Sequence, residues 1–264
     1  DGNLDFERGY LTNGPYGDLF DVITNSVGLD ELACYGVVWP LGHVSASPKL
    51  RRHLEEYVDE GGILIVDSAS SSLLPAAVLG VDIAHTVHYA TGIQTALGPV
   101  PPVNAPIAHH PITLDRHSLP LAWTDTGEPL LAWRKHGAGI VIVSGTVHWL
   151  DEAGQLTPLP SVLLRTLANA FSPVSCSADV QLMLNRTKDA WIVALINNNG
   201  VNKVPTLPEI ADPDEARECL LTFRGRPPKS FDAHIGEFIW DLGANGLITR
   251  IGPGDVAIVE VRDN

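Results

Sequence analysis

The first half of the chain alternates short apolar runs with an amphipathic stretch. Residues 35–41 and 63–66 are apolar runs of strand length, a pattern typical of strands buried on both faces. Between them, Ser47 caps a helix with Pro48 at its first position, and Gly61-Gly62 ends it. Strand, capped helix and strand in this order predict a βαβ unit with a parallel, right-handed crossover.

The rest of the first half carries weaker signals. We expect a short strand at 20–24, helices at 29–34, 73–79 and 160–171, and a hairpin that pairs 130–133 with 139–144. From 79 to 129 the periodicity breaks down, and only 85–89 is a strand candidate. Prolines here predict loops and short edge strands, with no long helix and no central strand; they stand at positions 99, 101, 102, 106, 111 and 120.

After about residue 172 the pattern becomes all-β. Alternating apolar positions, separated at short intervals by turns rich in Gly, Asn and Pro, predict a small β-sandwich. The predicted strands cover 180–184, 191–196, 219–223, 231–234, 238–241, 247–251 and 256–261. We therefore predict an α/β domain at 1–174 and a β-sandwich domain at 175–264.

Composition narrows the classes of partner. A hydrophobic content of 45% is that of a chain that buries real cores. The formal net charge of −14 argues against nucleic acid and membranes as partners. The three cysteines (Cys34, Cys176 and Cys219) are far apart, so we expect buried free thiols, with one disulfide as the alternative. The chain starts at Asp1 without an initiator Met, which suggests a processed or excised piece. The cellular compartment therefore cannot be inferred from a targeting segment.

Two stretches resemble known modules. The segment 20–67, with "FDVIT", "YGVVWPLGHVS" and "LRRHLEEYVDEGGILIVDS", resembles the class I glutamine amidotransferase-like domain that serves as a trimerisation domain in family 42-type β-galactosidases. The matching positions are Tyr35, Leu54, Tyr57, Val58, Gly61, Gly62 and Leu64. "WIVALINNNGVNKVP" and the terminal "IGPGDVAIVEV" are similar to the β-sandwich that closes many glycoside hydrolase chains.

This resemblance implies a flavodoxin-like (glutamine amidotransferase-like) α/β domain with a parallel sheet, followed by a small all-β sandwich. Only 19 residues precede the "FDVIT" strand, so the first βα unit of that fold is missing or lies upstream. A sheet without its first strand exposes an edge that another segment or protomer can pair with.

The positions that match the amidotransferase machinery lack a full set of reactive groups. The nucleophile position after 63–66 reads Asp67-Ser68-Ala69-Ser70, with no Cys, and these serines also suit the capping of the next helix. His148 matches the family's His, but the position two residues on is Leu150, and the nearest acid is Asp151 or Glu152. We interpret Ser68, His148 and Glu152 as weak catalytic candidates and predict no cofactor.

Other candidates are scattered. His85, His88, His109 and His110 could approach one another in the loop-rich region and bind a metal, but no HExxH or CxxC pattern supports a metal site. Trp39 and Trp149, like Trp123 and Trp133, could stack on sugar rings, although tryptophans in a buried α/β sheet are more often core residues.

Three functions stay open at this point. The first is a non-catalytic C-terminal portion of a carbohydrate-active, β-galactosidase-like glycoside hydrolase. It would serve homo-oligomer assembly and support an upstream catalytic domain or chain, with carbohydrate as a further possible partner. The second is a Ser/His hydrolase or amidotransferase-like enzyme that uses Ser68 and His148. The third is a carbohydrate-binding module, which requires an exposed aromatic row around Trp191 and Trp240.

Overall fold

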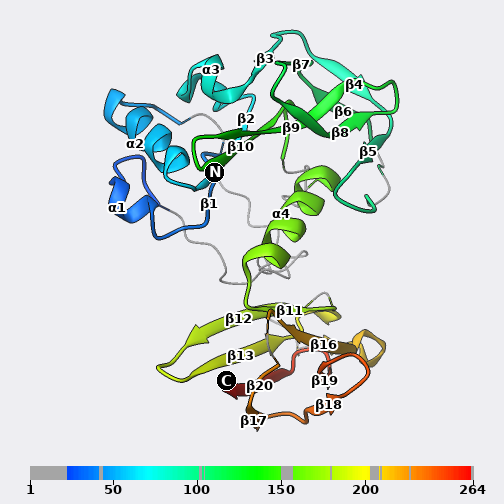
Figure 1. Ribbon diagram of the computed structural model, residues 1–264. Helices are drawn as coiled ribbons and strands as arrows, with labels where there is room; N and C mark the ends of the chain where they lie inside the picture. Colours follow the sequence, from blue (N-terminus) through cyan, green and yellow to red (C-terminus); the bar gives the residue numbers. More distant parts are fainter. Residues whose placement is uncertain are drawn as a thin grey trace. The chain divides into compact units, whose positions relative to one another are not determined.

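The computed structural model describes residues 23–41, 44–100, 103, 105–149, 157–178, 180–202, 208, 210–225 and 227–262. It contains two compact units, the N-terminal unit Ile23–Leu167 and the C-terminal unit within Ala168–Asn264 (Figure 1). The strand expected at 20–24 lies largely outside the described residues, and Ile23 and Thr24 are not in a strand. None of the helices in the described part is long and apolar enough to cross a membrane.

The N-terminal unit is built on a six-stranded sheet of order β1-β2-β10-β9-β8-β5. The strands are β1 (Val37–Val38), β2 (Ile63–Asp67), β5 (Ile93–Thr95), β8 (Leu119–Thr124), β9 (Pro129–His136) and β10 (Gly139–Ser144). β1, β2 and β10 are parallel, so the predicted parallel βαβ unit is confirmed. β10, β9, β8 and β5 pair antiparallel, which confirms the β9–β10 hairpin. The sheet is therefore mixed rather than wholly parallel.

Helix α2 (Pro48–Asp59) connects β1 to β2. The Ser47 hydroxyl accepts the Leu50 N–H at 3.1 Å, which is the expected cap. At the other end, the buried ring of Tyr57 lies where a Cβ on Gly62 would stand. The Tyr57 hydroxyl donates to the Tyr35 carbonyl at 2.9 Å. Only glycine at position 62 lets this ring tie the end of α2 to the sheet.

Shorter elements surround the sheet. The helix expected at 29–34 is α1 (Leu29–Leu32), and the one expected at 160–171 is α4 (Pro158–Phe171). The helix expected at 73–79 is split at Pro75 into η1 (Ser71–Leu73) and α3 (Ala76–Leu79). Two small antiparallel pairs complete the unit, namely β3 (Val81–Ile83) with β7 (Ile112–Leu114), and β4 (His88–Ala90) with β6 (Ile107–His109).

The prediction that prolines exclude a central strand from 79–129 is wrong for β8. This strand contains Pro120 and lies between β9 and β5. Its register with β9 shifts between Pro120 and Ala122, and again between Ala122 and Trp123. A proline at such an irregularity costs no regular ladder hydrogen bond, so the strand tolerates it.

The sheet has a hydrophobic core on each face. Leu64 and Val66 of β2 belong to a cluster with Leu54 and Val58 of α2. Ile65, between them in sequence, belongs to a second cluster that includes Leu163 of α4. This alternation follows from the period of two along a strand, and it explains why 63–66 is apolar throughout.

The C-terminal unit consists of two four-stranded antiparallel sheets, of order β11-β16-β19-β18 and β12-β13-β20-β17. One core includes Leu221 and Leu247 of the first sheet and Val193 and Val259 of the second. All the strands expected here are present. β11 and the short β14–β15 pair were not predicted from the sequence. The elements are β11 (Val174–Cys176), β12 (Gln181–Arg186), β13 (Ala190–Ile196), β14 (Val201–Asn202), β15 (Ile210–Ala211), η2 (Pro213–Glu215), β16 (Arg217–Phe223), β17 (Ser230–Ile235), β18 (Ile239–Asp241), β19 (Gly246–Ile251) and β20 (Val256–Arg262).

The three cysteines are free thiols. Cys219 is buried in the sandwich core and Cys176 is half-buried, but Cys34 is exposed. The expectation of buried thiols is therefore wrong for Cys34, because α1 ends at Leu32 and the chain after it lies at the surface.

Candidate functional site

The carboxyl ends of the three parallel strands form the edge where α/β sheets commonly bind ligands. Trp39 follows β1, Ser68 follows β2, and the segment 145–149 follows β10. Four of the candidate residues named from the sequence therefore lie on the connections that leave this edge, namely Trp39, Ser68, His148 and Trp149.

The turn after β2 is held by its own side chains. Asp67 is buried, and its carboxylate accepts both the N–H and the hydroxyl of Ser70, each at 2.7 Å. The Asp67 N–H in turn donates to the Ser70 hydroxyl at 3.0 Å, and the Ser71 hydroxyl donates to the Ser68 carbonyl at 2.9 Å. The hydroxyls of Ser70 and Ser71 thus hold the shape of the turn.

Ser68 contacts the segment between β10 and His148, but only through the backbone of that segment. Its hydroxyl donates to the Thr146 carbonyl at 3.4 Å. A serine nucleophile needs a basic nitrogen within about 3.2 Å of its oxygen. In the described part of the chain no hydrogen bond joins Ser68 to the exposed ring of His148, and Glu152 lies outside the described residues.

Trp39 and Trp149 pack against each other. Their ring centroids are 4.2 Å apart at an interplanar angle of 63°, an edge-to-face arrangement. Trp149 is only 6% exposed and belongs to the core cluster on the α4 face of the sheet, and the half-buried Trp39 packs against that cluster. Their indole N–H groups are buried and find no hydrogen-bond partner among the described residues. The enclosed Trp149 ring offers no open face to a sugar, and Trp39 is engaged by its packing against Trp149.

The tryptophans of the sandwich are half-buried and packed against other side chains. The Arg186 guanidinium lies 4.5 Å from the centre of the Trp191 ring. Trp240 stacks on Phe223 with ring centroids 6.2 Å apart. Trp191 is on β13 and Trp240 is on β18, which belong to different sheets, so they do not form the aromatic row that a carbohydrate-binding surface requires.

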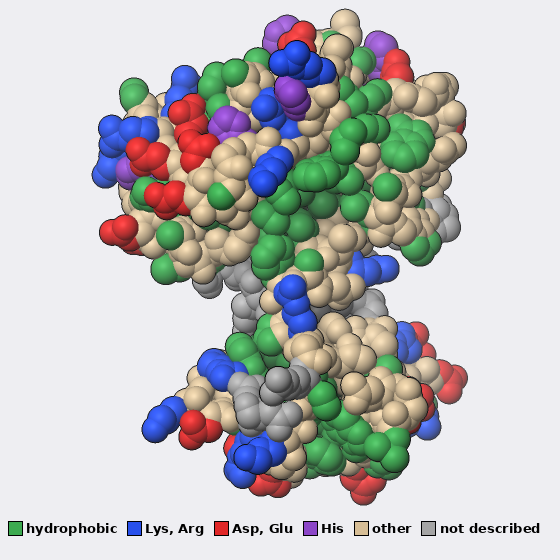
Figure 2. Space-filling model, viewed as in Figure 1, with side chains coloured by type: hydrophobic (Ala, Val, Ile, Leu, Met, Phe, Trp, Pro, Cys, Tyr) green, Lys and Arg blue, Asp and Glu red, His purple; other side chains and the backbone are tan. Residues whose placement is uncertain are grey.

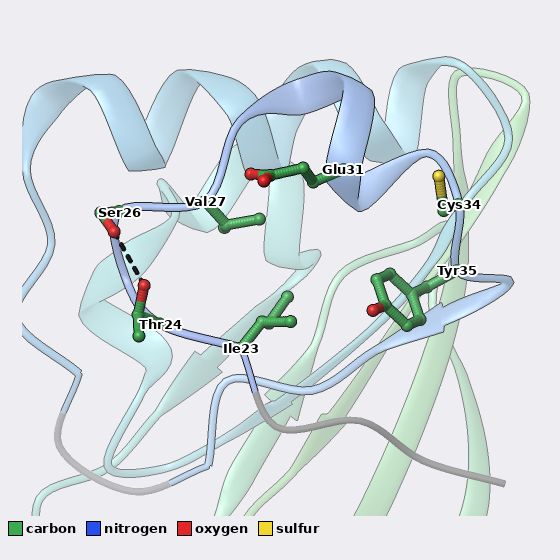
Figure 3. A pocket seen from close by; sticks show the side chains of 7 residues that line it. All are labelled: Ile23, Thr24, Ser26, Val27, Glu31, Cys34 and Tyr35. Carbon is green, nitrogen blue, oxygen red and sulfur yellow. Dashed lines mark hydrogen bonds between the residues drawn. The ribbon is translucent and has the colours of Figure 1, made fainter.

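One hollow among the described residues lies beside α1. It has a volume of about 390 Å³ and is lined by Ile23, Thr24, Ser26, Val27, Glu31, Cys34 and Tyr35 (Figure 3). Its polar groups serve local structure, since Thr24 and Ser26 hydrogen-bond to each other at 2.7 Å and the Glu31 carboxylate accepts the Gly28 N–H at 2.8 Å. We find no convergent reactive groups there.

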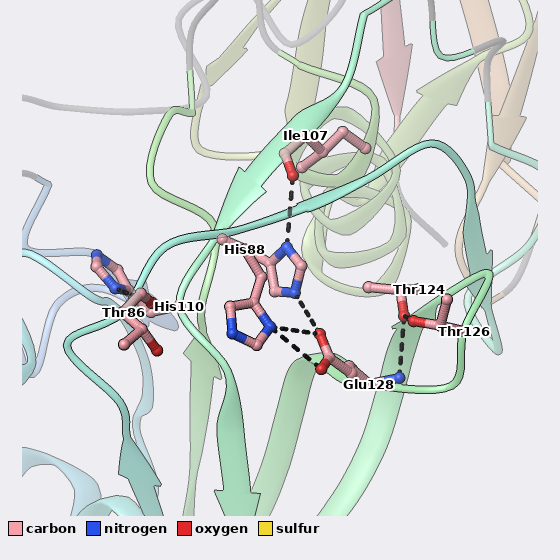
Figure 4. Close-up of polar contacts among 8 residues, drawn as sticks. Thr86, His88, Ile107, His110, Thr124, Thr126 and Glu128 are labelled. Atoms are coloured by element: carbon pink, nitrogen blue, oxygen red, sulfur yellow. Dashed lines mark hydrogen bonds and ion pairs between the residues drawn. The ribbon is translucent and has the colours of Figure 1, made fainter.

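The histidines of the loop-rich region do not all meet. His88 and His109 come together on Glu128, whereas His110 hydrogen-bonds to the Thr86 carbonyl at 3.0 Å and His85 is exposed (Figure 4). Hydrogen bonds from His109 and then His88 hold the pKa of the Glu128 carboxyl below its usual value. Glu128 is not among the candidates predicted from the sequence, because it is 19 residues from His109 and 40 from His88 along the chain.

Comparisons with known proteins bear on the fold alone. No protein-family model matches the chain, and no curated protein matches it. A GH42 β-galactosidase from G. stearothermophilus matches 92% of the chain over 34% of its own length, with a TM-score of 0.52 and 12% identity. An α-L-fucosidase, isoenzyme 2 from Paenibacillus thiaminolyticus, matches 93% of the chain over 43% of its own length, with a TM-score of 0.58 and 14% identity. The chain thus has a glycoside-hydrolase-like fold and spans less than half the length of either enzyme.

Proposed function

We propose that this chain is the non-catalytic C-terminal portion of a carbohydrate-active enzyme of the glycoside hydrolase class. The N-terminal unit would be a flavodoxin-like, glutamine amidotransferase-like domain of the β-galactosidase trimerisation type. Together with the sandwich it would serve subunit assembly and support a neighbouring catalytic domain. The two similar enzymes are longer than this chain and act on carbohydrates, which supports the parent class.

The observation that carries the proposal is the turn after β2. An acyl-transfer enzyme of this topology needs an activated nucleophile at that point. Here the Ser70 hydroxyl donates a hydrogen bond to the buried Asp67 carboxylate, and the Ser68 hydroxyl donates one to a backbone carbonyl. The edge beside it is filled by the Trp39–Trp149 pair rather than opened for a substrate.

A second feature supports a role in assembly. Large apolar side chains are exposed on β17, on β18 and directly after β18, and each of these two strands is one edge of its sheet in the sandwich. Ile239 is 69% exposed and Leu242 is 88% exposed, and Phe231 and Ile235 lie exposed on β17. Figure 2 shows hydrophobic side chains gathered over the part of the C-terminal unit that carries β18. Exposed apolar side chains at unpaired strand edges favour burial against a partner.

Light scattering on the eluting peak of a size-exclusion column tests the assembly role. We expect the wild-type chain to be an oligomer and Leu242→Lys to shift it toward the monomer, because an exposed apolar contact is replaced by a charge. Ile210→Lys is the matched control, since Ile210 is 66% exposed on β15, which pairs with β14 in a separate two-stranded sheet. A wild-type chain that stays monomeric at high concentration would contradict the proposal.

Enzymatic assays test the non-catalytic role separately. We expect no turnover of nitrophenyl glycosides or esters by the chain, and no covalent labelling by a serine-directed fluorophosphonate. Labelling of Ser68 that both Ser68→Ala and His148→Ala abolish would replace the proposal with the Ser/His hydrolase.

A further inference from the structure

A compact group of two imidazoles and one carboxylate lies in the N-terminal unit, outside the edge discussed above. Glu128 Oε2 is 2.9 Å from His109 Nε2 and 3.2 Å from His88 Nδ1. The ligand atoms of the three residues all lie within 4.8 Å of one another. We propose that His88, His109 and Glu128 form a binding site for a divalent transition-metal ion, with Zn²⁺ as the representative ion.

The backbone sets the two histidines opposite each other. His88 on β4 and His109 on β6 are direct cross-strand partners, so both side chains stand on the same face. β6 is also held on its other side, where the His110 N–H donates to the Gly145 carbonyl at 2.7 Å and the Val147 N–H donates to the Ala108 carbonyl at 3.0 Å. His109 therefore has backbone segments on both sides of its strand, and its side chain is only 1% exposed.

A separate turn brings the carboxylate to them. The chain reverses after β8 at Gly127, which has a φ of +91°. The Glu128 N–H donates to the Thr124 hydroxyl at 2.9 Å, and the Thr124 N–H donates to the Glu128 carbonyl at 2.8 Å. The same turn is tied to the loop after β4, because the Thr91 hydroxyl donates to Asp125 at 2.7 Å. Glu128 is thus fixed on a closed turn and points at both rings (Figure 4).

This donor set suits zinc and related ions. Imidazole nitrogen and carboxylate oxygen are zinc ligands, and two histidines with one carboxylate leave a coordination position open for water or another ligand. The His109 Nδ1 lies 3.4 Å from the Ile107 carbonyl, the kind of outer contact that orients a ligand ring and leaves Nε2 for the metal. His88 and Glu128 are 46% and 39% exposed, which gives an ion access from solvent. The net charge of −14 favours the approach of cations.

Calorimetric titration of the chelator-treated full chain with Zn²⁺ tests the proposal. We expect saturable one-to-one binding. His88→Ala and Glu128→Gln should each weaken it by at least about tenfold, because even outer contacts to ligands are worth about 10- to 100-fold in affinity. His85→Ala is the matched control, since His85 is exposed three residues before His88 and lies outside the cluster; it should bind as wild type does.

A thermal measurement provides a second readout. Zn²⁺ should raise the unfolding temperature of the wild type and of His85→Ala, but not that of His88→Ala or Glu128→Gln, because a ligand stabilises only the state that binds it. Mg²⁺ should have no comparable effect, since it prefers oxygen ligands. His88 and Glu128 are partly exposed, so scans in chelator should show both variants folded. Wild type without saturable one-to-one binding, or with binding that both variants retain, overturns the proposal.

Discussion

Replacement of Gly62 by alanine should destabilise the N-terminal unit through one side chain, the ring of Tyr57. An added Cβ would lie closer than 3.0 Å to three atoms of that ring, and the ring is almost fully buried against α2 and β2. It cannot move without weakening the hydrogen bonds from its hydroxyl to the carbonyls of Tyr35 at 2.9 Å and Ile63 at 3.3 Å.

The size of the effect follows from these two losses. Overpacking a close-packed core costs roughly 1–3 kcal/mol, and losing a buried hydrogen bond costs roughly 1–3 kcal/mol more. We therefore expect Gly62→Ala to lower the free energy of unfolding by about 3 kcal/mol, which for a unit of this size lowers the melting temperature by roughly 6–12 °C. Gly92→Ala is the matched control, because its added Cβ meets nothing closer than Asp125 at 3.4 Å, and it should change stability by less than about 1 kcal/mol.

Urea unfolding of a double-mutant cycle identifies the cause. If the clash with the ring is responsible, Gly62→Ala should cost much less in a Tyr57→Leu background than in the wild type, since the smaller side chain leaves room for the methyl group. An equal cost in both backgrounds would refute the reasoning. It would show that the penalty arises in the backbone after α2 rather than in the packing of Tyr57.

Three further predictions concern single side chains. Burial raises the pKa of Tyr57 to about 12 from 10.0, so the unfolded state loses the phenol proton at a lower pH than the folded state does. The urea midpoint of the wild type should therefore fall as the pH rises from 10.0 toward 12. The midpoint of Tyr57→Phe should fall less over the same pH range. Ser47→Ala removes the cap of α2 and should cost about 1 kcal/mol in urea unfolding, whereas Ser45→Ala, at an exposed position before the helix, should cost nothing measurable. In thiol titration with Ellman's reagent, the exposed Cys34 should react in the native protein and Cys219 only after unfolding, and Cys34→Ser should remove the fast phase.

The elements that the sequence predicted well depend on local signals. Ser47 and Pro48 start α2 and Gly61-Gly62 ends it, so the capping pattern alone sets its limits. The strands of the sandwich follow from alternation and frequent turns, as β13 and β20 illustrate. In both cases the residues that determine an element are its own neighbours in sequence.

The secondary structure of the region 79–129 was predicted poorly from the sequence because it depends on pairing between distant segments. β8 forms between β9 and β5 despite Pro120, because this proline, which has no N–H, lies where the register between β8 and β9 is irregular. The candidate site shows the same limit. The four histidines of this region were visible in the sequence, but which two meet depends on the β4–β6 register. Glu128 joins them from the turn between β8 and β9, which belong to a different sheet, and no local pattern marks it.

The distribution of polar chemistry in the N-terminal unit separates the two proposals. At the carboxyl edge of the parallel strands, Asp67 and Ser70 satisfy each other, and Trp39 and Trp149 fill the adjacent space. A carboxyl edge filled by the protein's own side chains is compatible with a module that supports other domains, but it would obstruct the binding of a substrate. The two histidine donors lie instead on β4 and β6, a strand pair outside the six-stranded sheet, and the Glu128 carboxylate reaches them from the turn between β8 and β9. Loss of Zn²⁺ binding in His88→Ala should therefore leave the oligomeric state unchanged, and loss of assembly in Leu242→Lys should leave Zn²⁺ binding unchanged, so each proposal can fail without the other.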